Sequence, residues 1–307
     1  MKKLIILILC LLTFLSSICG CSLKQATDTS KIQIVASCFP AYDFARQICK
    51  DNAQITLLLK PGAEAHDFEP TPSDIIAIKE SDLFICVGSE SEKWVDTLTK
   101  SADGLNMIKM MDVVDCEEVH HESEHKGHSH SHDDHVWTSP HNAKLICTEI
   151  YNNLCIKAPQ LQNEFSKNYD SLISSLDNLD AIFKDISEKA ENKLLVFADR
   201  FPLRHFTDEY GFKVIAAFPG CSSHTEPNID DVIKLIEDVK KNNIPAVFYT
   251  EFSNQKMADT VCEETGCKKL LFHSCHNVTK DEWKNGETYY SLMLKNSENL
   301  KKSLGIN

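Results

Sequence analysis

Histidine is concentrated in one short internal stretch of this chain. The segment "HHESEHKGHSHSHDDHVWTSPHN", residues 120–142, contains eight of the 13 histidines in a sequence of 307 residues. Imidazole binds zinc, copper and nickel well at neutral pH. Because the histidines are interleaved with Glu, Asp, Ser and Gly, the segment either collects metal ions or is a solvated polar loop. The positions of the other potential metal ligands in the chain help to decide between these two interpretations.

Several potential metal ligands stand at or just beyond the ends of predicted strands. His66 follows "QITLLL", Asp199 ends "LLVFAD", Glu251 ends "PAVFYTE", His273 ends "KKLLFH", and His135 closes the histidine-rich segment. The carboxyl ends of parallel strands meet at one edge of a sheet, where α/β proteins bind their ligands. A lone histidine is more often a hydrogen-bonded core or surface residue than a ligand. Recurrence of such residues at strand ends favours a metal site.

Strands and helices alternate in both halves of the sequence. The segments "IQIVASCF", "QITLLLKPG" and "LFICVGS" predict strands in the first half, and "TPSDIIAIKESD" predicts a helix with Ser73 as its N-cap. Between the halves, apolar residues recur at spacings of three and four from Leu161 to Ile186, which indicates one long amphipathic helix. We therefore predict two α/β lobes with central parallel sheets, joined by one long backbone helix, with a metal site in the cleft between the lobes.

The N-terminus has the features of a lipoprotein export signal. Two lysines precede an apolar run over residues 4–15, which is too short to span a bilayer, and small residues follow it. The closing "ICGC" resembles a bacterial lipobox, which makes Cys21 the lipidated first residue of the mature protein. We therefore expect the protein to be anchored by lipid to the extracytoplasmic face of the cell membrane.

These features divide the chain into five expected segments. They are a signal peptide (1–20), a tether (21–31), an N-terminal lobe (32–157) that contains the histidine-rich loop (118–135), a connecting helix (158–190) and a C-terminal lobe (191–307).

Charge and cysteine content narrow the possible functions. A net charge of −13 disfavours a nucleic-acid partner, which requires a basic surface, and suits a cationic ligand. Ten cysteines lie beyond residue 21, and no C-x-x-C pair is present. Two interpretations remain open, namely buried free thiols that pack as small apolar groups and at least one disulfide.

Two motifs carry a resemblance to a known family. The segments "KPGAEAHDFEPTPSD" and "DDHVWTSPHNA" are similar to signatures of the solute-binding lipoproteins of zinc and manganese ABC importers, the metal-binding cluster of periplasmic binding proteins. The resemblance extends over essentially all of the mature chain. It implies that His66 and His135 bind the metal ion.

The resemblance is less direct for the other two ligands. The third ligand of the family, His or Glu, falls on Arg200, which cannot bind a cation, so Asp199 is the nearest donor and His205 and His224 are alternatives. The fourth ligand, usually Asp in the family, falls on His273. The expected ligands are therefore His66, His135, Asp199 and His273.

The resemblance implies a high-affinity zinc-binding component of an ABC importer that delivers Zn²⁺ to a membrane permease driven by an ATPase. We expect a monomer. We also expect that it is not an enzyme, because a catalytic zinc ion keeps an open position for water, whereas the four expected protein ligands would fill this site. A manganese-binding member or a metal-sequestering surface adhesin is the alternative, although imidazole ligands favour zinc. A metallohydrolase with Glu64 or Glu69 as its base lacks an "HExxH" motif. The histidine-rich loop either concentrates zinc or has no role, and His141 is expected at the surface.

Overall fold

The computed structural model describes residues 30–65, 68–101, 104–114, 133–218 and 229–306. The residues Ile32–Asn307 form one compact unit. Several predictions concern residues outside the described part, namely the signal peptide, the lipidated Cys21, most of the tether, His66, His224 and the histidine-rich loop up to residue 132.

The first half of the unit contains a sheet of four strands and its helices. These elements are β1 (Ile32–Ala36), α2 (Phe39–Cys49), β2 (Ala53–Leu57), α3 (Pro72–Glu80), β3 (Leu83–Cys86), α4 (Lys93–Ser101), β4 (Met107–Lys109), α5 (Met110–Val113), the 3₁₀ turn η3 (Val136–Thr138) and α6 (Pro140–Lys157). The long helix α7 (Gln162–Lys189) follows. The second half contains β5 (Leu194–Arg200), α8 (Arg204–Tyr210), β6 (Lys213–Phe218), α9 (Ile229–Lys241), β7 (Ala246–Tyr249), α10 (Lys256–Thr265), β8 (Lys268–Leu271), α11 (Lys280–Lys284) and α12 (Tyr289–Leu304).

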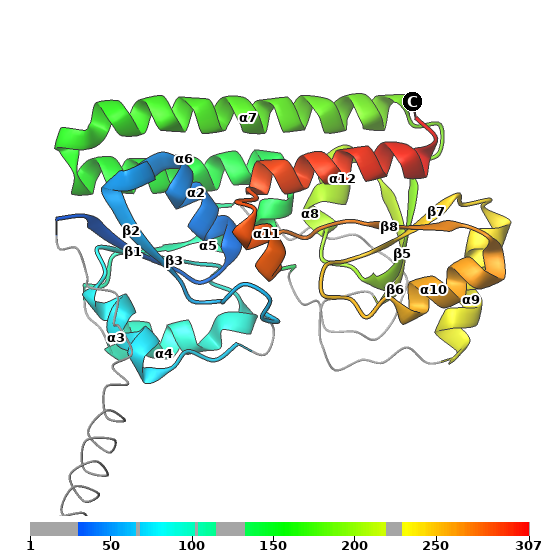
Figure 1. Cartoon of the computed structure of the whole chain (residues 1–307), viewed down its shortest axis with the longest axis horizontal. Coiled ribbons are helices and arrows are strands. Elements are labelled where there is room, and N and C mark those ends of the chain that lie inside the picture. Colours follow the sequence, from blue (N-terminus) through cyan, green and yellow to red (C-terminus); the bar gives the residue numbers. More distant parts are fainter. Residues whose placement is uncertain (1–29, 66–67, 102–103, 115–132, 219–228, 307) are drawn as a thin grey trace, which may run out of the picture. The chain divides into compact units, whose positions relative to one another are not determined.

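The two sheets have the same topology. Their strand orders are β2-β1-β3-β4 and β6-β5-β7-β8, and every strand pair is parallel. We call the part around the first sheet the first lobe and the part around the second sheet the second lobe. Two α/β lobes with a long helix are thus confirmed (Figure 1).

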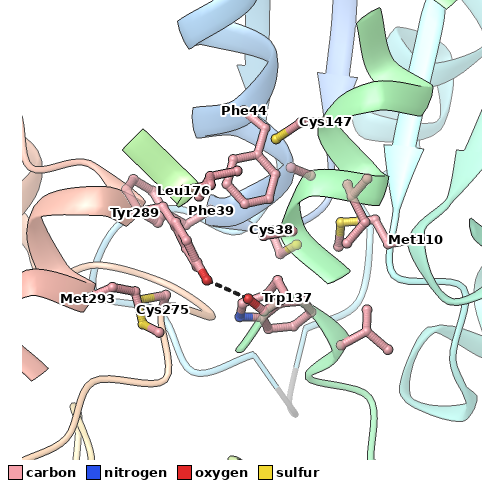
Figure 2. Close-up of a cluster of buried hydrophobic side chains, with 14 of the residues drawn as sticks. Cys38, Phe39, Phe44, Met110, Trp137, Cys147, Leu176, Cys275, Tyr289 and Met293 are labelled. Carbon is pink, nitrogen blue, oxygen red and sulfur yellow. Dashed lines mark hydrogen bonds between the residues drawn. The ribbon is translucent and has the colours of Figure 1, made fainter. Parts of the chain in front are cut away.

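Helix α7 runs along both lobes and supplies a core that they share (Figure 1). It has 28 residues and contains no Gly or Pro, which corresponds to a length of about 42 Å. Its apolar face is buried against α2, α6 and α12 through Phe165, Leu172, Leu176, Leu179, Phe183 and Ile186. Residues of both lobes belong to the same apolar cluster. In Figure 2, Leu176 of α7 lies near Phe44 of α2, and the hydroxyl group of Tyr289 donates a hydrogen bond to the carbonyl oxygen of Trp137.

The opposite faces of the sheets have their own smaller cores. One contains Val35, Ile78 and Phe84 of the first lobe, and another contains Val196 and Val247 of the second. Within the described residues, no helix has both the length and the apolar character that crossing a bilayer requires.

The N-cap predicted for α3 was wrong by two residues. Thr71, and not Ser73, caps the helix, because its hydroxyl group accepts a hydrogen bond from the backbone N–H of Asp74 and the Asp74 carboxylate accepts one from the Thr71 backbone. Pro72 then occupies the first helical turn, where its missing N–H group costs nothing.

The shared core predicts that the two lobes unfold together. Leu176→Ala removes a fully buried side chain of α7 and should lower the free energy of unfolding by about 2–5 kcal/mol. Urea unfolding, followed by far-UV circular dichroism, should show one transition shifted to lower urea. The control Ser174→Ala changes an exposed position of the same helix and should leave the midpoint unchanged. A variant in which one lobe unfolds early and the other at its original midpoint would contradict a shared core.

Candidate metal centre

His135 is held in one orientation by the largely buried carboxylate of Asp133. It stands directly before η3 and is almost fully buried, and its Nδ1–H donates to Oδ1 of Asp133 at 2.8 Å. The backbone N–H of His135 donates to the same oxygen at 3.1 Å. Burial alone would raise the pKa of Asp133, but the hydrogen bonds that its carboxylate accepts from the ring and the backbone of His135 hold this pKa at about 2. Because Nδ1 carries the proton, Nε2 of His135 presents a lone pair and not a hydrogen.

The ring of His276 faces that lone pair. Nε2 of His135 lies 3.1 Å from Nδ1 of His276, and the two ring centroids are 5.0 Å apart in an edge-to-face arrangement. Two nitrogens that bind one tetrahedral zinc ion at about 2.0–2.1 Å lie about 3.3 Å apart. The observed spacing is therefore close to that required for two imidazoles that share one ion.

A strained backbone turn aims His276 at His135. Cys275 has a φ angle of 62°, in the left-handed region that residues other than Gly rarely adopt. The turn is braced locally, because the Cys275 backbone N–H donates to Nδ1 of His273 at 2.9 Å and the His276 backbone N–H donates to Oγ of Ser274 at 3.2 Å. Glu251 in turn accepts hydrogen bonds from the backbone and the hydroxyl group of Ser274.

His273 is buried and has its own set of partners. Its Nε2 lies 3.5 Å from Oε2 of Glu282, and its backbone N–H and carbonyl groups both bond to the Asn296 side chain. Burial alone would raise the pKa of Glu282, but His273 and two hydrogen bonds from Thr279 hold it at about 2. The structure thus brings His276, rather than the predicted His273, to His135. A sequence signal existed, since "HSCH" places a second histidine just beyond the same strand.

The chain that leads to His66 is anchored directly beside His276. Asn277 is buried, and its Nδ2 donates to the carbonyl oxygens of Lys60 and Ala63, both at 2.9 Å. The backbone N–H of Gly62 donates to the Val278 carbonyl at 2.8 Å. The loop that precedes His66 is therefore fixed to the residues that follow His276.

The predicted third ligand has other partners. Oδ2 of Asp199 accepts hydrogen bonds from the backbone N–H and the hydroxyl group of Thr250, both at 2.9 Å, and Oδ1 accepts from the backbone of Arg200. Asp199 thus joins the ends of β5 and β7. The alternative donor His205 bonds through Nε2 to the carbonyl oxygen of Asp133 at 2.9 Å.

Arg200 occupies the position of the expected third ligand and pairs with an acid of the other lobe. Its Nη1 lies 3.6 Å from Oε1 of Glu64, two residues before His66. This partly exposed ion pair connects Glu64 to the end of β5 and adds little to the stability of the contact. Within the described residues, no three His, Cys, Asp or Glu side chains are grouped closely enough to hold a metal ion. The ligand assignments therefore remain predictions.

The architecture and the histidine pair define a class of protein, the two-lobed solute-binding proteins built around one long helix. The chain belongs to the family described as "Zinc-uptake complex component A periplasmic", which it matches over residues 34–303.

Known relatives of this family cover most of the chain. It is 32% identical over 297 residues to the "High-affinity zinc uptake system protein ZnuA" of Bacillus subtilis, which covers 93% of this chain and 92% of the relative. It is 30% identical to the "Zinc-binding lipoprotein AdcA" of Streptococcus pneumoniae, over 94% of this chain but only 60% of that longer protein. The crystal structure of the Zn(II)-bound ZnuA-like domain of AdcA superposes with a TM-score of 0.75 at 29% identity, covering 89% of this chain and 99% of that one.

The anchoring of the His66 loop predicts a cost for losing Asn277. Asn277→Asp keeps the side-chain shape but removes both N–H donors, which leaves two carbonyl oxygens opposite a buried carboxylate. We expect the free energy of unfolding to fall by about 1–3 kcal/mol or more. Urea denaturation at neutral pH measures this loss. The same substitution at the exposed Asn163, in the first turn of α7, should not destabilise the protein, because an acid is favourable at a helix N-terminus. Equal stability of the two variants would show that Asn277 does not hold the loop.

Proposed function

We propose that this chain captures Zn²⁺ outside the cytoplasm and delivers it to the permease of an ABC importer, acting as a binding protein and not as an enzyme. The observation that carries the proposal is the pair of ring nitrogens of His135 and His276, 3.1 Å apart. The anchored loop before His66 lies beside the same pair. The zinc-related names of the relatives support the choice of cargo.

In this proposal the ion is held by His66, His135 and His276, each from a different segment. Three neutral imidazoles favour zinc over manganese, which prefers carboxylate and water ligands. Asp199 and His273 support the structure around the site and do not bind the ion. The buried network of Glu251, Ser274 and His273 sets the direction of His276.

Zinc titration of single variants tests this ligand set. His135→Ala and His276→Ala should each weaken zinc binding by at least about 100-fold, more than the loss of an outer hydrogen-bond partner costs. His273→Asn keeps an acceptor for the Cys275 N–H and should stay within about tenfold of the wild type. Competition titration with a zinc chelator measures these affinities, and a parallel manganese titration should show weaker binding.

The exposed His141 provides the matched control, and His141→Ala should bind zinc as the wild type does. If His276→Ala bound zinc tightly and His273→Asn lost binding, His273 and not His276 would be the ligand from this loop.

The Asp133 carboxylate should contribute to affinity without touching the ion. Asp133→Asn allows the amide to donate to Nδ1 of His135, which disfavours the tautomer that presents the Nε2 lone pair. Zinc affinity should fall by about 10–100-fold, the usual effect of an outer-shell partner. Thermal unfolding of the zinc-free variant serves as the control for folding. An unchanged affinity in a folded variant would remove Asp133 from the site.

We also propose the organisation expected at the N-terminus, with cleavage after residue 20 and lipidation of Cys21. The protein would then act as a monomer on the outer face of the cell membrane. Cys21→Ser should move the protein from the membrane fraction to the soluble extracytoplasmic fraction, as measured by immunoblotting of fractionated cells. Retention of this variant in the membrane fraction would contradict a lipid anchor at this residue.

A further inference from the structure

Two cysteines of the second lobe lie in contact with one another. Sγ of Cys262, in the last turn of α10, is 3.4 Å from Sγ of Cys267, which directly precedes β8. Both residues are partly accessible. The other partly accessible cysteine of the described residues is Cys155 of α6, whereas five are buried, namely Cys38, Cys49, Cys86, Cys147 and Cys275.

The backbone around the pair is fixed independently of the sulfurs. Gly266 ends α10 in the left-handed conformation, with a φ angle of 76°, and its N–H donates to the Cys262 carbonyl at 2.8 Å. The Cys267 N–H donates to Oγ1 of Thr265 at 3.3 Å. Parallel pairing of β8 with β7 begins at the next residue, Lys268. The helix cap and the strand therefore hold the two thiols together. Because folding has already closed this short loop, forming the bond requires little further loss of chain entropy.

We propose that Cys262 and Cys267 form an intramolecular disulfide, closed by a small-molecule disulfide oxidant outside the cytoplasm. One thiolate attacks the oxidant and releases one reduced thiol, which leaves a mixed disulfide. The second thiolate attacks the protein sulfur of that bond and releases the second reduced thiol. Two protein thiols and one disulfide are thus converted into one protein disulfide and two small thiols.

Location and geometry both support this modification. Proteins outside the cytoplasm meet oxidising conditions in which disulfides persist, and the sulfurs need to approach by only about 1.4 Å to reach bonding distance. Burial and the neighbouring Cys267 raise the pKa of Cys262 to about 12, so oxidation without a catalyst should be slow. The disulfide would fasten the end of α10 to β8, the strand that leads to the 272–276 loop.

Peptide mass mapping tests the proposal directly. Trypsin releases residues 257–268 as "MADTVCEETGCK", a single peptide that carries both cysteines. After incubation of the folded protein with oxidised glutathione and alkylation of the remaining thiols, this peptide should be two hydrogens lighter than its reduced form and carry no alkyl group. Cleavage after Glu263 or Glu264 should leave the two fragments joined until a reductant is added.

Variants link the bond to stability. The oxidised wild type should unfold a few degrees above the reduced protein, whereas Cys262→Ser should unfold at the same temperature with or without oxidant. Cys155→Ser, at a partly accessible position on α6, should keep the redox-dependent shift. Two alkyl groups on the tryptic peptide after oxidation, or one sulfur retained as a glutathione mixed disulfide, would overturn the proposal and leave the two thiols as a packing contact.

Discussion

The geometry of the candidate site depends on a buried indole that ties the first lobe to the loop that carries His276. Nε1 of Trp137 donates to the Ser274 carbonyl at 2.9 Å, and the Trp137 carbonyl accepts from the hydroxyl group of Tyr289 at 2.6 Å. Both aromatic side chains are almost fully buried, so these hydrogen bonds do not compete with water. The ring of Trp137 also packs against the rings of His135 and His276. Contacts with the buried core therefore fix the positions of the two imidazole rings.

The loop over residues 272–276 shows how local strain is offset by its surroundings. A non-glycine residue in the left-handed region costs about 1 kcal/mol or more, and Cys275 adopts this conformation. Hydrogen bonds from Asn296 hold the backbone of His273, and Glu251 holds Ser274 on the other side. The strained residue thus lies between two segments that are fixed by buried partners. These partners hold the loop in the conformation that places His276 beside His135.

The sequence was sufficient to predict the lobes and the long helix, because both depend on local periodicity. The alternation of apolar strands with helices, and the spacing of three and four from Leu161 to Ile186, carry that information directly. Helix α6 escaped prediction because Thr, Tyr and Asn are weak helix formers and its apolar residues are not confined to one face. Leu145 and Ile156 of this helix are exposed while Ile150 is buried.

The candidate site was harder to predict than the fold. Which histidine of this loop faces His135 depends on the loop backbone, including the positive φ angle of Cys275, which its residue type does not predict. Asp199 was predicted as a ligand from its place at the end of a strand, and no local pattern indicated its hydrogen-bond partner Thr250, which lies 51 residues away in the chain. His205 likewise bonds to a carbonyl 72 residues away. Such pairings arise only when distant segments meet, so the residue pattern alone does not reveal them.

The continuous helix α7 also limits how the two lobes can move. Because its apolar face is part of a core that both lobes share, swinging them apart would expose that core to water. We infer that the empty and loaded forms have nearly the same outline, and that the cargo enters and leaves through small shifts of the loops around it. Solution scattering should therefore barely distinguish the two forms, whereas amide exchange in those loops should.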